Sequence, residues 1–247
     1  MSFKDHFSKQ AADYAKFRPQ YPRALFQFIE SISPDNRLAL DVATGRGQAA
    51  IALAEFFEKV IGIDPSEKQI ASAERHGGVE YHIASAESTG LLPHSCDAVT
   101  VAQALHWFDL DAFYAEARRI LRPRGMLAVW TYTHLEIAPE IDTVVRHFYN
   151  EIVGPFWPPE RRIVESGYRD LPFPFLEIKA PPFQIEERWT LEHLLGYLRT
   201  WSATQRFIAE HKTDPIDQIA TDLAKAWGNP AEERLTVWPL TTRIGRA

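Results

Sequence analysis

Residues 41–48 read DVATGRGQ, and they overlap the end of an apolar run, Leu38–Val42. The run predicts a buried strand, and the small residues after it predict a tight turn whose backbone can come close to a ligand. A helix is expected from Gln48 to Phe57, and the free N–H groups at its start would favour an electronegative group. We therefore predict a ligand-binding strand, turn and helix at this position.

The same alternation of apolar strands and helical stretches continues up to residue 132. It predicts an α/β fold, a doubly wound and mostly parallel sheet with helices on both faces. The expected strands after Leu38–Val42 are Val60–Ile63, Val79–Ile83, Ala98–Ala102 and Met126–Tyr132, and further helices are expected at Arg23–Ile32 and Ala112–Leu121.

The second half of the chain follows a different pattern. Seven prolines between residues 154 and 182 interrupt helices and central strands and predict an irregular insert. Helices are expected over residues 190–201 and 216–227, and a last strand at Arg234–Arg243, where Pro239 predicts an edge position or a bulge. We expect a single domain, divided into an N-terminal lid and helix (1–35), a ligand-binding core (36–133), a substrate-side insert (134–232) and a final strand (233–247).

Composition excludes several classes of protein. The chain of 247 residues is 45% apolar and 24% charged, which excludes a disordered chain, and its net charge of −6 argues against a nucleic-acid partner. It contains no apolar stretch that could span a membrane, and the N-terminal residues MSFKDHFSKQ do not resemble a secretion signal, so a cytoplasmic protein is expected. Cys96 is the only cysteine, which excludes an internal disulfide, and no metal site is expected.

A second acidic residue points to the kind of ligand. Asp64 ends the second predicted strand, and Ser66 and Gln69 form a capping box that starts the next helix there. A carboxylate at this strand tip can accept hydrogen bonds from both hydroxyls of a ribose. Together with the turn after Asp41, it predicts a nucleoside site.

Two kinds of nucleoside fit the turn. Gly45, Gly47 and Ala50 match the GxGxxA pattern of dinucleotide-binding proteins, so an NAD-dependent oxidoreductase is one interpretation. However, the carboxylate of Asp41 would repel a pyrophosphate and would suit a ligand with an ammonium group. A cationic nucleoside is therefore favoured.

These motifs resemble those of the class I S-adenosylmethionine-dependent methyltransferases. An acidic residue followed by GxGxG is that family's first motif; here it is Asp41 with Ala43, Gly45 and Gly47, so alanine replaces the first glycine. The resemblance extends over residues 7–132 and more faintly from 189 to the end. It implies S-adenosyl-L-methionine as cofactor and a seven-stranded sheet. It also implies cofactor contacts from a set of loop residues at the strand ends, namely Asp64, Pro65, Ala86, Glu87, Gln103, His106 and Trp107.

The resemblance also indicates the acceptor. The segment over residues 7–22 is similar to the lid of a small-molecule subgroup that includes trans-aconitate methyltransferase, and residues 191–202 resemble its substrate-side helix. The candidate substrate-binding residues are Tyr14, Arg18, Tyr21, Tyr197, Arg199 and Trp201. A small molecule, a carboxylic acid in particular, is the expected acceptor, because Arg18 and Arg199 suit a carboxylate.

The resemblance implies no obligatory catalytic residue. A hydroxyl acceptor would need a base, for which His106 and His134 are the candidates, whereas a carboxylate is already ionised. A non-catalytic module that binds S-adenosylmethionine is the other alternative to the oxidoreductase. The expected assembly is a monomer or a homodimer.

Overall fold

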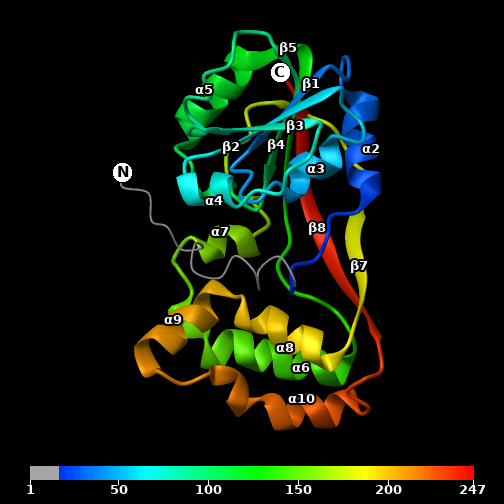
Figure 1. The fold of residues 1–247 in the computed structure, drawn as a ribbon, viewed down its shortest axis with the longest axis vertical. Helices are drawn as coiled ribbons and strands as arrows, with labels where there is room; N and C mark the ends of the chain where they lie inside the picture. The colour runs from blue at the N-terminus through cyan, green and yellow to red at the C-terminus, as the bar shows by residue number, and fades with distance from the viewer. Residues whose placement is uncertain (1–16) are drawn as a thin grey trace.

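The computed structural model describes residues 17–247, and a sheet with parallel strands forms its centre (Figure 1). The parallel strands are β1 (Leu38–Val42), β2 (Lys59–Asp64), β3 (Val79–Ile83), β4 (Cys96–Ala102) and β5 (Leu121–Thr131). They lie in the order β3-β2-β1-β4-β5, which reverses direction between β1 and β4. Ligands of such sheets bind at the carboxyl ends of the strands beside this switch point.

The long last strand connects the sheet to the insert. The second half of β8 (Arg234–Arg246) pairs antiparallel with β5 and with the short β6 (Leu176–Glu177). Its first half pairs antiparallel with β7 (Phe183–Trp189), where Pro239 lies opposite Gln184. The main path, β3-β2-β1-β4-β5-β8-β6, has seven strands, and β7 is an additional one that pairs with β8 alone. The predicted seven-stranded, mostly parallel α/β sheet is confirmed.

Helices cover both faces of this sheet because successive residues of a strand point to opposite sides. On one face, α2 (Arg23–Ile32) and α3 (Gln48–Leu53) form a core with alternate strand residues such as Ala98. On the other face, α5 (Leu110–Ile120) packs on the residues in between, such as Val99. The sheet is therefore doubly wound, as the alternation of strands and helices predicted.

Two helix positions agree with the sequence, and two others differ from it. The helix predicted over Arg23–Ile32 is confirmed, and α4 (Glu67–Ala71) begins after Ser66, whose Oγ accepts a hydrogen bond from the Gln69 N–H. The helix predicted from Gln48 to Phe57 ends at Leu53 instead, and the chain then turns so that Phe57 is buried. The predicted helix over residues 216–227 is divided into η4 (Pro215–Gln218) and α10 (Ala220–Trp227).

The insert has its own apolar core. It contains α6 (Pro139–His147), the π-helical turn η2 (Phe148–Ile152), η3 (Gly154–Phe156), α7 (Arg161–Glu165), α8 (Leu191–Arg199) and α9 (Ser202–His211). Helices α6, α8, α9 and α10 gather at one end of the molecule, and α7 lies between them and the sheet (Figure 1). The proline-rich stretch 154–182 holds only η3, α7 and β6, in agreement with the prediction of an irregular segment.

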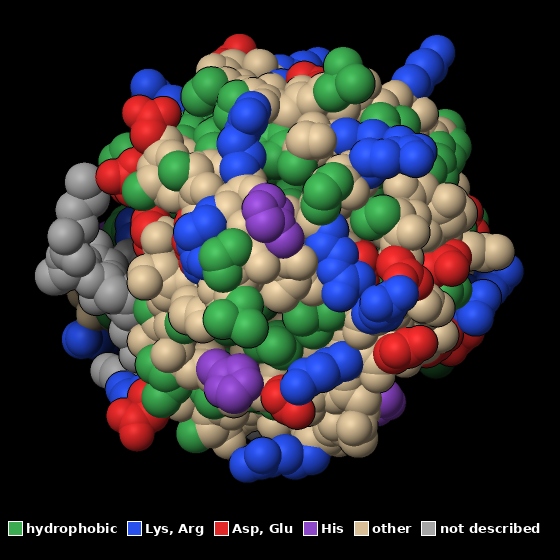
Figure 2. Space-filling model, turned by 90° about the horizontal axis from the view of Figure 1, so that it is seen from above, with side chains coloured by type: hydrophobic (Ala, Val, Ile, Leu, Met, Phe, Trp, Pro, Cys, Tyr) green, Lys and Arg blue, Asp and Glu red, His purple; other side chains and the backbone are tan. Residues whose placement is uncertain are grey.

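The surface at the opposite end of the molecule is mixed in charge. Figure 2 shows Lys and Arg side chains interspersed with Asp, Glu and apolar side chains on this face. Among residues 17–247, no helix has the length and apolar character needed to cross a membrane.

Candidate functional site

The turn after β1 is tight, as predicted. The φ angle is +54° at Ala43, +56° at Gly45 and +90° at Gly47, all in the left-handed region. This conformation costs a residue with a Cβ about 1–2 kcal/mol, so Ala43 is strained where a glycine would not be. A Cβ added at Gly45 would have no atom within 4 Å, which leaves space for a ligand beside the turn.

Asp64, the last residue of β2, joins this turn to the next helix. One carboxylate oxygen accepts a hydrogen bond from the Gly45 N–H at 3.0 Å, and the other accepts one from the Ser66 N–H at 2.9 Å. The side chain is buried, and Pro65 beside it is exposed. The carboxylate is therefore held beside Gly45, at the position where such folds bind ribose hydroxyls.

Asp41 lies in β1, directly before the turn. It has no exposed surface, and its carboxylate accepts hydrogen bonds from the hydroxyls of Thr44, at 2.6 Å, and Thr100, at 2.8 Å. Burial raises the pKa of Asp41 to about 6 against the effect of these hydrogen bonds. The Asp41 carboxylate therefore holds Thr44 of the turn, and it can act on a ligand through its charge.

Tyr81 of β3 supports the turn from the side of α3. A Cβ added at Gly47 would lie 1.9 Å from the Tyr81 hydroxyl oxygen, so this position requires glycine. The hydroxyl is buried and has no hydrogen-bond partner within residues 17–247. Burial, and then the charge of Asp41, raise the pKa of Tyr81 to about 12. Tyr81 therefore stays protonated beside the acidic turn.

The end of β4 is strained in the same way as the end of β1. Gln103 has a φ of +57°, and its side chain accepts a hydrogen bond from the Thr131 hydroxyl at 2.6 Å and donates one to the Tyr132 carbonyl at 3.1 Å. Strained backbone is often found at functional sites. The predicted cofactor residue Gln103 thus connects the carboxyl ends of β4 and β5.

His106 lies next along the chain, in η1 (Leu105–Trp107). Its Nδ1 is 3.0 Å from the hydroxyl of Tyr168, a residue of the insert, and its ring centroid is 4.6 Å from that of Trp107. Burial, and then the positive charge of Arg161, lower the pKa of His106 to about 3. The imidazole is therefore neutral near pH 7, so it does not repel a cationic ligand, and it is a weak base.

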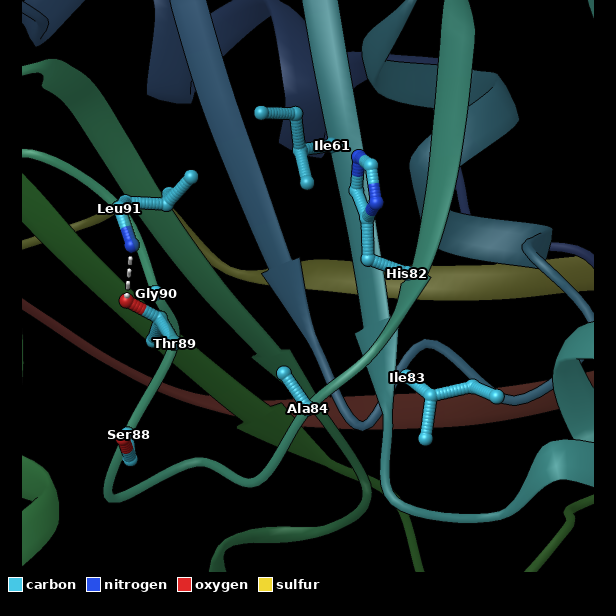
Figure 3. Close-up of a pocket in the computed structure, with 8 residues that line it drawn as sticks. All are labelled: Ile61, His82, Ile83, Ala84, Ser88, Thr89, Gly90 and Leu91. Atoms are coloured by element: carbon cyan, nitrogen blue, oxygen red, sulfur yellow. Dashed lines mark hydrogen bonds between the residues drawn. The ribbon is translucent and has the colours of Figure 1, made fainter.

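The segment after β3 contributes the remaining predicted cofactor residues. Ala86 is buried, and Glu87 accepts a hydrogen bond from the Asp109 N–H at 3.1 Å, which connects this segment to the start of α5. A pocket of about 410 Å³ lies beside this segment, and Figure 3 shows the residues that line it. It is lined by Ile61, His82, Ile83, Ala84, Ser88, Thr89, Gly90 and Leu91. None of the predicted site residues lines it, so it is separate from the strand-end site.

On the insert side, aromatic rings gather around Tyr149 of η2. The ring centroids of Trp157, Trp201 and His134 lie 4.8, 5.6 and 4.8 Å from the Tyr149 centroid. The Arg161 guanidinium lies over the Tyr149 ring as well, 5.3 Å from its centroid. Of the predicted residues, His134 and Trp201 are thus brought together here. We refer to Tyr149, Trp157, Trp201, His134 and Arg161 as the aromatic cluster.

Two predicted residues of the N-terminal segment pack on the core. Arg18 donates hydrogen bonds to the Tyr132 hydroxyl at 3.5 Å and the Thr200 carbonyl at 3.4 Å, joining β5 to the insert. The Tyr21 ring packs edge-on against the Trp130 ring, with centroids 5.5 Å apart. Both residues are half-buried, and Tyr14 lies outside the described residues.

Arg199 and Tyr197, two other predicted substrate residues, lie on the same helix, α8, but have different surroundings. Arg199 is exposed and forms an ion pair with Asp214 at 2.7 Å. Tyr197 is 2% exposed and packs against Trp189 and Trp238, which makes it a core residue of the insert. Tyr197 also contacts two other predicted residues: its ring centroid is 5.8 Å from that of Trp201, and the Arg18 guanidinium carbon lies 5.4 Å from it. Substrate binding by Arg199 and Tyr197 stays a prediction.

Several residues of the site were not found from the sequence. Thr44, Thr100 and Tyr81 carried no motif of their own, although Thr44 stands inside the quoted turn. Residues 148–168 show no helical or strand periodicity, so nothing in the sequence indicated the site residues of the insert. These are Tyr149, Trp157, Arg161 and Tyr168. Among residues 17–247, no three His, Cys, Asp or Glu side chains are placed to hold a metal ion together.

Comparisons with known proteins agree with the strand-end site. Residues 40–129 match the family model described as "Methyltransferase domain". The chain is 36% identical over 229 residues to a protein of Dictyostelium discoideum that bears a methyltransferase name, covering 91% of this chain and 87% of that protein. It is 32% identical over 136 residues to a Saccharomyces cerevisiae protein named as an S-adenosylmethionine-dependent methyltransferase, covering 51% of this chain and 47% of the yeast protein.

A solved structure extends the likeness to the insert. A structure from Anaeromyxobacter dehalogenans, described as a type II methyltransferase, is 50% identical with a TM-score of 0.89. The match covers 93% of this chain and 98% of that one, so it includes the insert as well as the core. The relatives named here bear methyltransferase names, and the NAD-dependent alternative is therefore not favoured.

Proposed function

This chain belongs to the class I S-adenosylmethionine-dependent methyltransferases, and we propose that its methyl acceptor is a small carboxylic acid. S-adenosyl-L-methionine is the cofactor. The proposal places the chain in the small-molecule subgroup whose lid the N-terminal segment resembles. In support, Gln48 at the start of α3 donates a hydrogen bond to the Pro19 carbonyl, so the described part of this segment around Pro19 lies next to the glycine turn.

The strand-end residues fit the cofactor. We assign Asp64 to binding the ribose hydroxyls of the cofactor. The open side of Gly45 lets the cofactor come close to the backbone, and the buried charge of Asp41 attracts the positive charge of the cofactor from a distance. His106 stays neutral, so it can lie beside a sulfonium without repelling it. Trp107 is 40% exposed and offers an aromatic face to a cation or to adenine.

The observation that supports an acid is the aromatic cluster with its arginine on α7, the helix that precedes Tyr168, the hydrogen-bond partner of His106. When bound, the cofactor supplies a sulfonium methyl group, which a carboxylate oxygen takes up as a methyl ester while the sulfur leaves as a neutral thioether. An ionised carboxylate needs no base, which suits a site whose nearest imidazole, His106, is a weak one. The protein's own part is to align the reactants and exclude water.

The experiment measures S-adenosylhomocysteine formation by the full chain with matched sets of small carboxylic acids, phenols and amines. We expect turnover with an acid and a product that alkali cleaves to methanol. Transfer to amines or phenols alone would contradict the choice of acceptor. Binding of S-adenosylhomocysteine without turnover on any set would favour the non-catalytic module.

Asp64→Asn provides the test of the cofactor site. Because it weakens two hydrogen bonds to a charged group, we expect the Kd for S-adenosylhomocysteine to rise about 10- to 100-fold by calorimetry. Glu67→Gln, three residues further along and exposed, is the matched control and should bind as the wild type does. Equal affinities of Asp64→Asn and wild type would remove Asp64 from the site.

A further inference from the structure

Arg161, the first residue of α7, lies against two aromatic rings at the junction of core and insert. Its Nε donates a hydrogen bond to the Tyr149 hydroxyl at 2.6 Å. Its guanidinium carbon lies 5.3 Å from the Tyr149 ring centroid and 4.7 Å from that of Trp157. Both contacts restrict the side chain, so its charge has a defined position before any ligand binds.

A third residue completes this arrangement. The Tyr149 hydroxyl donates its proton to the Glu165 carboxylate, one turn further along α7, so the hydroxyl oxygen is left to accept from Arg161. No carboxylate of the described chain lies within ion-pair distance of the guanidinium. Glu165 therefore orients Arg161 through Tyr149 and does not neutralise it directly.

The outer atoms of the guanidinium remain available. The two Nη atoms of Arg161 make no hydrogen bond to residues 17–247, and they are absent from the polar atoms sealed from solvent without a partner. A planar pair of N–H donors beside two aromatic rings matches a carboxylate attached to an apolar or aromatic body.

The charge of Arg161 also reaches the strand-end site. After burial, it is the next cause that lowers the pKa values of His106 and His134, which follow β4 and β5. Geometry agrees: Tyr149, which bonds to Arg161, packs against His134, and Tyr168, three residues after α7, is the hydrogen-bond partner of His106. The other candidate arginines are engaged differently: Arg18 bonds to Tyr132 and Thr200, and Arg199 pairs with Asp214.

We infer that Arg161, positioned by Tyr149 and Glu165, binds the carboxylate of the acceptor, and that the surrounding rings select an acid with an aromatic or apolar body. This inference rests on the proposed function. It assigns acid recognition to a residue of the proline-rich segment in place of Arg199.

The test is a binding measurement that needs no turnover. The full chain, saturated with S-adenosylhomocysteine, is titrated calorimetrically with benzoate and 3-phenylpropionate and with the corresponding neutral amides. The wild type should bind at least one acid more tightly than its amide. Arg161→Gln should lose about 10- to 100-fold in affinity for that acid and little for the amide, because a charge-assisted pair of hydrogen bonds is removed.

The controls separate recognition from folding. Arg162→Gln, an exposed neighbour on the same helix, should leave both affinities unchanged. Arg161→Lys keeps the charge without the paired donors and should weaken acid binding less than Arg161→Gln, with the Kd for S-adenosylhomocysteine unchanged in both variants. Loss of S-adenosylhomocysteine binding in both would show a structural role and overturn the inference.

Two further outcomes decide the question. A wild type that does not prefer any acid to its amide, or an Arg161→Gln variant that keeps the preference, would overturn the inference. If acid binding depends on Arg161 but acids are never methylated, the proposed acceptor fails while the anion site stands. If acids are methylated and Arg161→Gln binds them normally, the acceptor stands and the anion site fails.

Discussion

The two sides of the site, the strand ends of the core and the aromatic cluster of the insert, are built in different ways. At the strand ends, hydrogen bonds hold the two acidic side chains. The Asp64 carboxylate accepts from two backbone N–H groups, and the Asp41 carboxylate accepts from two threonine hydroxyls. In the insert, the aromatic cluster consists of side chains from separate elements, whose rings pack against one another. The proposed cofactor site therefore depends on a preformed turn, whereas the proposed acceptor site shares its residues with a hydrophobic core.

The largest effect should therefore come from the insert. Trp201 is buried and packs on Tyr149 and Trp157, so Trp201→Ala should lower the free energy of unfolding by about 3–5 kcal/mol, measured by urea denaturation. Trp107→Ala, which removes a half-exposed ring at the strand ends, is the control and should cost less than about 1 kcal/mol. Equal losses in the two variants would contradict this difference between the two sides.

The next effect concerns Asp41 and pH. Because the folded pKa of about 6 lies above the ordinary value of 3.8, the folded protein binds a proton more tightly, and this group's contribution to stability falls as pH rises from about 4 to 6. Two pKa units correspond to about 3 kcal/mol. In Asp41→Asn this dependence should disappear, which unfolding curves of both proteins between pH 4 and 7 would show. A wild-type advantage that grows with pH would contradict the sign.

The smallest effect concerns the strained turn. Ala43 has a φ of +54°, so Ala43→Gly should stabilise the protein by about 0.5–1 kcal/mol and leave the Kd for S-adenosylhomocysteine equal or lower. Ala49→Gly, in α3, is the matched control and should destabilise by about 1 kcal/mol. If both variants lose stability alike, the turn carries no relievable strain.

The sequence predicted the core because its signals there are local. The helix at Arg23–Ile32 and the cap at Ser66 each depend on a few adjacent residues, and both are confirmed. The predicted end of the helix at Phe57 was wrong. The chain turns after Leu53 so that Phe57 is buried, and no cap residue in the sequence indicates this turn. In the insert, helix periodicity placed the Leu residues of α8 correctly but could not show that Arg199 pairs with Asp214.

By itself, then, the sequence determined the doubly wound sheet, the glycine turn and the two acidic strand ends, since residues close in the chain specify strand, turn and cap. Only the tertiary structure decided that two threonine hydroxyls enclose Asp41 and that Arg161 contacts Tyr149, whose ring packs against His134. The aromatic cluster joins a loop after β5, η2, α7 and the residues between α8 and α9. Contacts between such distant segments follow from packing, which leaves no spacing pattern along the chain.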